Sequence, residues 1–119
     1  MIIAVWIVSG LLALANLGAG GMKLATPKEK LGPQMAWAES FSPLQIKLIG
    51  LAEVLGAIGL IVPVLAGIAP ILTPIAAIGL SIIQVGAIVT HLRRKEPVVV
   101  NLVLLAFAVF VAVTRLLGV

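Results

Sequence analysis

Residues 43–62 read PLQIKLIGLAEVLGAIGLIV, and Lys47 and Glu53 are the only charged side chains in this stretch. A helix of about 20 predominantly apolar residues is long enough to cross the hydrocarbon core of a membrane. Pro43 suits the first turn of such a helix, where the missing N–H of proline leaves no hydrogen bond unmade. Pro63 follows the stretch directly and is expected to end the helix.

The composition of the whole chain matches this membrane-spanning stretch. Of the 119 residues, 62% are hydrophobic and 10% are charged, whereas about a quarter of a soluble domain is charged. The mean hydropathy is +1.30. Further apolar stretches suited to crossing are residues 2–21, 73–91 and 98–117. Four spans and their short connections use nearly the whole length, so residues 1–119 are predicted to form one all-α transmembrane domain, a four-helix bundle running up-down-up-down.

Basic residues are distributed unevenly between the two ends of the predicted bundle. Because successive spans alternate in direction, the first and the last connection lie on the same side of the membrane. That side carries seven basic residues and the other side only Arg115: Lys23, Lys28, Lys30, Lys47, Arg93, Arg94 and Lys95. Basic loops remain in the cytoplasm. We therefore expect cytoplasmic charged loops, both termini outside, and a bacterial inner (cell) membrane as the location.

Two features of the composition exclude whole classes of chemistry. The chain has no cysteine, which rules out disulfides, thiol catalysis and cysteine-ligated zinc or iron–sulfur clusters. It has a single histidine, His91, and no other metal-ligating residues cluster with it in the sequence, so no metal site is predicted. The net charge of +4 is explained by the basic loops of a membrane protein, and no nucleic-acid partner is expected.

Small and polar residues recur at steps of three and four in every predicted span. Residues at this spacing share one helix face, and helices in lipid associate through small residues and polar contacts. These faces are therefore expected to point into the bundle. Gly79 and Gly86 form a second small-residue face on the third span, which is expected either to pack internally or to contact a second copy in a homodimer. The inward stripe of the first span is Ser9, Ala13, Asn16, Gly20 and Lys23, and that of the second is Lys47, Gly50, Glu53, Gly56 and Gly59.

Seven polar residues form the candidate ligand site or polar node. At 1.5 Å rise per residue, the spacings predict a shallow layer near the charged loops and a layer about 9–10 Å deeper. The shallow layer consists of Lys23, Lys47, His91 and Asn101, and the deeper layer of Asn16, Glu53 and Gln84.

Glu53 is the most informative of these residues, because an unpaired carboxylate inside a membrane costs several kcal/mol. Three interpretations stay open: a neutral acid bonded to the amides of Asn16 and Gln84, a carboxylate paired with Lys47, or a ligand or proton site. His91 either caps the end of its helix or donates a hydrogen bond to a lipid headgroup or a quinone carbonyl.

Three segments of the chain resemble the DoxX-like family of small four-helix membrane proteins. They are residues 21–24 (GMKL), 46–60 (IKLIGLAEVLGAIGL) followed by Pro63, and 86–93 (GAIVTHLR). Relatives in that family include the membrane subunit of a thiosulfate:quinone oxidoreductase and a factor that assists receptor assembly. The resemblance implies the four-helix fold but no established catalytic residues.

The sequence favours a non-catalytic membrane module that binds a lipid-like ligand or a partner membrane protein. The alternative is a quinone-binding membrane subunit of an oxidoreductase system, with quinone as cofactor and electrons supplied by a partner redox protein. A small proton-coupled transporter is less favoured, because such proteins carry their membrane acid in the first span rather than the second. The chain is not expected to be an enzyme on its own.

Overall fold

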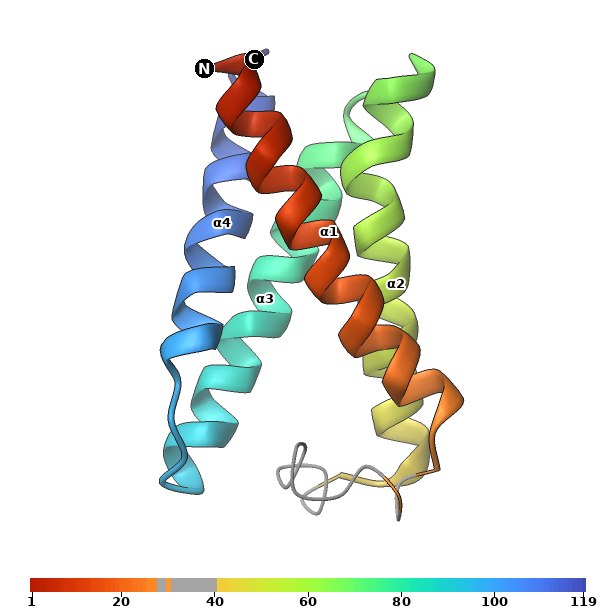
Figure 1. Cartoon of the computed structure of the whole chain (residues 1–119), viewed down its shortest axis with the longest axis vertical. Helices are drawn as coiled ribbons and strands as arrows, with labels where there is room; N and C mark the ends of the chain where they lie inside the picture. Colours follow the sequence, from red (N-terminus) through yellow and green to blue (C-terminus); the bar gives the residue numbers. More distant parts are fainter. Residues whose placement is uncertain (28–29, 31–40) are drawn as a thin grey trace.

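The computed structural model describes residues 1–27, 30 and 41–119, and these form four long helices (Figure 1). The helices are α1 (Ile2–Ala25), α2 (Pro43–Ala66), α3 (Leu72–Arg93) and α4 (Val99–Leu116). They run up-down-up-down, and the two chain ends meet at one end of the bundle. Lys28 of the expected basic loop lies outside the described residues.

All four helices are long and apolar enough to cross a membrane, so the protein is an integral membrane protein. Their outer faces are covered with exposed large hydrophobic side chains, such as Leu14, Leu65 and Ile82. Water would make such a surface unstable, whereas lipid acyl chains solvate it. The predicted all-α four-helix bundle is therefore confirmed.

The helices pack in a ring, in which α1 and α2 form one hairpin and α3 and α4 form the other. Packing within each hairpin is more extensive than packing of α1 against α4 or α2 against α3. The apolar core lies in the half of the bundle that holds the chain ends. Arg115 of α4 stacks over the ring of Trp6 of α1, 4.8 Å from its centroid, and ties these helices at that end. The core residues are Leu12, Ala13, Ala57, Leu60, Ala77, Leu80, Ala108, Val111 and Ala112.

The expected end of the second span at Pro63 is wrong, because α2 continues through Pro63 to Ala66. Proline has no N–H to donate to the carbonyl four residues earlier, which here belongs to Gly59. The hydroxyl of Thr73 donates to that carbonyl from α3 at 2.8 Å, so the acceptor is not left unpaired. The third span was predicted to begin at residue 73, but α3 begins one residue earlier, at Leu72, and Thr73 bonds across to α2.

Local signals fix both ends of α2. Ser42 and Gln45 form a reciprocal capping box at its start, with Pro43 in the first turn. Gly67 ends the helix in the left-handed region, with φ of 69°, a conformation that glycine adopts without steric cost. The turn that follows reverses the chain into α3 within five residues, 67–71.

Glycines on the two predicted small-residue faces have different surroundings. A Cβ atom on Gly56 would lie 2.6 Å from Leu80, and one on Gly59 would lie 2.8 Å from the Cβ of Ala76. These two glycines therefore admit α3 close to α2. No atom of the described part of the chain lies within 4 Å of a Cβ placed on Gly79 or Gly86. Internal packing of that second face is therefore wrong, and its role in a homodimer stays a prediction.

Candidate functional site

The centre of the candidate site is an ion pair between Lys23 of α1 and Glu53 of α2. The ammonium Nζ lies 2.5 Å from Oε1 of the carboxylate. The two residues are only 5% and 4% exposed, so both charges are buried inside membrane-spanning helices. Each side chain leans toward the N-terminus of its own helix. Because α1 and α2 are antiparallel, the two side chains lean toward each other.

Two glycines one turn away make room for this pair. A Cβ atom on Gly20 would lie 2.6 Å from the carbonyl oxygen of Gly50 and 3.1 Å from the Cβ of Glu53. A Cβ atom on Gly50 would lie 2.9 Å from the carbonyl oxygen of Gly20 and 2.7 Å from the Cβ of Lys23. The arrangement is reciprocal: in each helix a glycine precedes the charged residue by three positions and faces the partner's charged residue.

The sequence contained a signal for this pair that the spacing argument missed. Gly-x-x-Lys at 20–23 and Gly-x-x-Glu at 50–53 are matching motifs on helices of opposite direction. The interpretation that paired Glu53 with Lys47 is wrong. Lys47 is exposed and donates to the carbonyl of Leu24 at 3.0 Å, where it satisfies an acceptor in the last turn of α1.

A second polar pair ties α3 to α4 at the same depth. The amide of Asn101 donates to Oε1 of Gln84 at 3.0 Å. Gln84 lies one turn beyond Leu80, which contacts Gly56, and Glu53 lies about one turn before Gly56. Because α2 and α3 are antiparallel, Glu53 and Gln84 lie at one level. Each hairpin thus has one polar side-chain pair at this level: Lys23–Glu53 between α1 and α2, and Gln84–Asn101 between α3 and α4.

Asn16 does not form the hydrogen bond to Glu53 that the sequence suggested. Its amide nitrogen donates to the carbonyl of Leu12 in its own helix at 2.8 Å. Its side-chain oxygen is buried and has no hydrogen-bond partner among the residues that the structure describes, and the residue is 1% exposed. Ser9, two turns earlier on the same face, also has a buried hydroxyl oxygen without a partner.

The prediction of two separate polar layers is therefore wrong. Asn101 bonds to Gln84 of the deeper layer, and the Lys23 side chain reaches inward to Glu53, so two contacts join residues that were assigned to different layers. The lysine stem extends several ångströms along the helix axis, a reach that Cα spacing ignores. The structure brings together Lys23 with Glu53 and Gln84 with Asn101, and it leaves Lys47 and His91 outside these pairs.

His91 is engaged in the turn between α3 and α4. Its Nδ1 lies 2.9 Å from Oε1 of Glu96, and Nε of Arg94 lies 3.3 Å from the same oxygen. The hydrogen bond from His91, helped by Arg94, holds the pKa of Glu96 below its usual value. The backbone of Glu96 also donates to the carbonyl of His91 at 2.8 Å, while Lys95 adopts the left-handed region with φ of 57°. His91 thus binds Glu96 through both its side chain and its carbonyl at the C-terminal end of α3.

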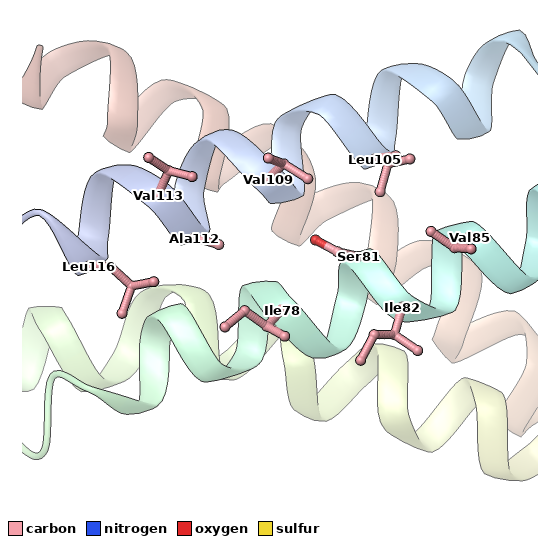
Figure 2. Close-up of a pocket in the computed structure, with 9 residues that line it drawn as sticks. All are labelled: Ile78, Ser81, Ile82, Val85, Leu105, Val109, Ala112, Val113 and Leu116. Atoms are coloured by element: carbon pink, nitrogen blue, oxygen red, sulfur yellow. The ribbon is translucent and has the colours of Figure 1, made fainter.

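An apolar groove runs along the outer side of α3 and α4 (Figure 2). Its volume is about 480 Å³. On α4 it extends from Leu105 to Leu116, a rise of about 16 Å at 1.5 Å per residue. The hydroxyl of Ser81, the polar group among its lining residues, donates to the carbonyl of Ala77 in its own helix. The lining residues are Ile78, Ser81, Ile82, Val85, Leu105, Val109, Ala112, Val113 and Leu116.

The groove ends where the second polar pair begins. Val85 follows Gln84 directly, and Leu105 lies one turn beyond Asn101. The hydrogen bond between the two amides holds α3 and α4 together at that point. The lining side chains in Figure 2 lie on α3 and α4, which face each other across the groove.

Comparison with known proteins identifies a family. A family model described as the DoxX-like family matches residues 7–113, which include both polar pairs and most of the groove. No curated protein and no solved structure matches the chain.

Proposed function

Because this integral membrane protein belongs to the DoxX-like family, we propose that it is a non-catalytic module that binds a lipid-like ligand. The ligand lies with an apolar chain in the groove between α3 and α4. The observation that carries the proposal is the lining of that groove, which is apolar except for a serine whose hydroxyl is already bonded to its own helix. A site of this kind recognises a hydrocarbon chain by shape.

The dimensions of the groove support a single chain rather than a whole lipid. Its length of about 16 Å is roughly half of a hydrocarbon core about 30 Å thick. One end of it lies beside the Gln84–Asn101 bond, and the groove extends from there toward the chain ends. A chain from the leaflet on the chain-end side fits this direction, with its tip at mid-membrane. With the charged loops in the cytoplasm, as we propose, that leaflet is the outer one.

The experiment is to purify the protein in a mild detergent and identify the co-extracted small molecules by mass spectrometry. Val109→Trp should fill the groove and reduce the amount of bound lipid severalfold. Val103→Trp is the matched control, because it lies on the same helix, lines no part of the groove, and is 45% exposed against 46% for Val109. The control should retain the ligand content of the unmodified protein.

Other outcomes would change the proposal. A co-extracted quinone that Val109→Trp displaces would favour the alternative of a quinone-binding subunit. A second copy or a partner membrane protein that covers the outward glycines Gly79 and Gly86 would appear as a higher mass in native mass spectrometry. Equal lipid content in the Val109→Trp and Val103→Trp proteins would contradict binding in the groove.

A further inference from the structure

The Lys23–Glu53 pair takes no part in the groove, and its burial needs a separate explanation. Two charges withdrawn from water cost free energy that a pair of apolar residues would not cost. Close contact of α1 and α2 at this level is made by Gly20 and Gly50, whose backbones approach directly. Helix packing alone therefore does not require the ion pair. Acids that face the interior of a membrane bundle are the groups from which proton sites are built.

We propose that Glu53 is an intramembrane proton-binding site with two arrangements of its partners. In the first, the carboxylate is ionised and paired with Lys23, as in the structure. In the second, a proton from water has added to the carboxylate, and the neutral Glu53 donates its O–H to the side-chain oxygen of Asn16. Lys23 keeps its own proton throughout, so each uptake raises the charge of the protein by one.

The unpaired oxygen of Asn16 is the observation that identifies the second arrangement. A buried acceptor without a donor destabilises the fold, and the amide nitrogen of Asn16 already bonds to Leu12. The Gly20 position lies 3.1 Å from the Cβ of Glu53. Residues four apart on a helix have Cβ atoms about 5–6 Å apart. The Cβ atoms of Asn16 and Glu53 are therefore within about 9 Å, so the hydrogen bond forms when Glu53 turns away from Lys23 and extends toward the chain-end side of the bundle.

Lys23 has a route out of the bundle in the second arrangement. It lies in the last turn of α1, two residues before the helix ends at Ala25. A long lysine stem near a helix end turns its ammonium toward the membrane surface when no counter-ion holds it inside. The cation therefore reaches water on the side of the charged loops instead of remaining buried and unpaired.

The charged groups near this site are few in the part of the chain that the structure describes. Lys23 faces Glu53 from α1, and Lys47 on α2 is engaged with the carbonyl of Leu24. At the level of Glu53, α3 and α4 contribute the neutral amides of Gln84 and Asn101, which bond to each other. His91 is paired with Glu96 in the α3–α4 turn.

Infrared difference spectroscopy on the reconstituted protein tests the proton site directly. The chain has only four carboxyl side chains, so bands are simple to assign. Acidification should produce a protonated-carboxyl band of Glu53 in the unmodified protein, beside those of the other three glutamates, and only this band should be missing from Glu53→Gln. If the unmodified protein shows no protonated-carboxyl band beyond those of Glu53→Gln, the proposal fails.

Lysine labelling tests the release of Lys23 at constant neutral pH. Glu53→Gln mimics the neutral arrangement, because its amide nitrogen can donate to Asn16. This variant should fold, and a water-soluble amine reagent should label Lys23 severalfold more than in the unmodified protein, with exposed Lys95 as reference. Unchanged labelling of Lys23, or a Glu53→Gln protein that does not fold, overturns the proposal.

Asn16→Leu tests the acceptor. Loss of one hydrogen bond to the protonated state should move the midpoint of proton uptake about one pH unit lower. Ser9→Ala is the control, because it removes the other unpaired buried oxygen on the same face of α1 and should leave the midpoint unchanged. Equal midpoints for Asn16→Leu and the unmodified protein would contradict the assignment of Asn16.

Discussion

The hydroxyl of Thr73 donates a hydrogen bond across 2.8 Å to the backbone carbonyl of Gly59 on the neighbouring helix. In an uninterrupted helix this carbonyl would accept from the N–H of residue 63, which is a proline. Thr73 is completely buried, so no water replaces it. A side chain at the start of α3 thus replaces the hydrogen bond that Pro63 cannot make, and this allows α2 to continue through Pro63.

Thr73→Val should destabilise the protein by about 1–3 kcal/mol, because it leaves a buried carbonyl without a donor. The shape of the side chain is nearly retained, so the loss reports on the hydrogen bond. Stability is measured by unfolding in mixed micelles. The background Pro63→Ala supplies the missing N–H to Gly59, and there Thr73→Val should cost much less. An equal cost in both backgrounds would show that the bond does not compensate for the proline.

Gly20→Ala should destabilise the hairpin of α1 and α2 by roughly 1–3 kcal/mol, the usual cost of overpacking. The new methyl group would lie 2.6 Å from the carbonyl oxygen of Gly50, and a backbone atom cannot move aside cheaply. Gly18→Ala is the control, since nothing lies within 4 Å of its Cβ position. Alanine favours helix more than glycine does, so this control should be as stable as the unmodified protein or more stable.

Glu96 should make the stability of the α3–α4 turn depend on pH. Its pKa is lowered in the folded protein, first by the hydrogen bond from His91. The carboxylate therefore stabilises the fold above the pKa of the unfolded chain, and this contribution is lost as the pH falls through the lower folded pKa. The melting temperature of the unmodified protein should exceed that of Glu96→Gln at neutral pH. The two curves should converge on acidification, and a difference that grows instead would contradict this assignment.

The orientation in the membrane can be tested with single cysteines, because the chain has none of its own. Arg94→Cys should be protected from an impermeant thiol reagent in intact cells, since we expect the charged loops in the cytoplasm. Leu117→Cys lies at the opposite end of the bundle and should react. Both variants should react after the membrane is permeabilised, and reversed accessibility in intact cells would invert the proposed topology.

Much of the inward-facing surface could be predicted from the sequence. All five residues of the predicted stripe on α1 are buried, including Ser9, Asn16 and Lys23. The prediction succeeds because helical periodicity places residues on a face regardless of which helix lies opposite. On α2 it succeeds for Gly50 and Glu53 but fails for Lys47, which is exposed. The long apolar stretches also predicted the number of helices, because a membrane demands a minimum length.

The four spans, their alternating direction and most of the faces that turn inward could be predicted from composition and periodicity, because these act within each helix. Which polar groups meet, in contrast, depends on how the helices pack. Glu53 pairs with Lys23, thirty residues away, rather than with Lys47 on its own helix. The physical reason is that partner choice depends on the axial register of antiparallel helices, which the Gly20–Gly50 contact fixes, and on the direction in which each side chain leans. Neither quantity is a property of a single helix.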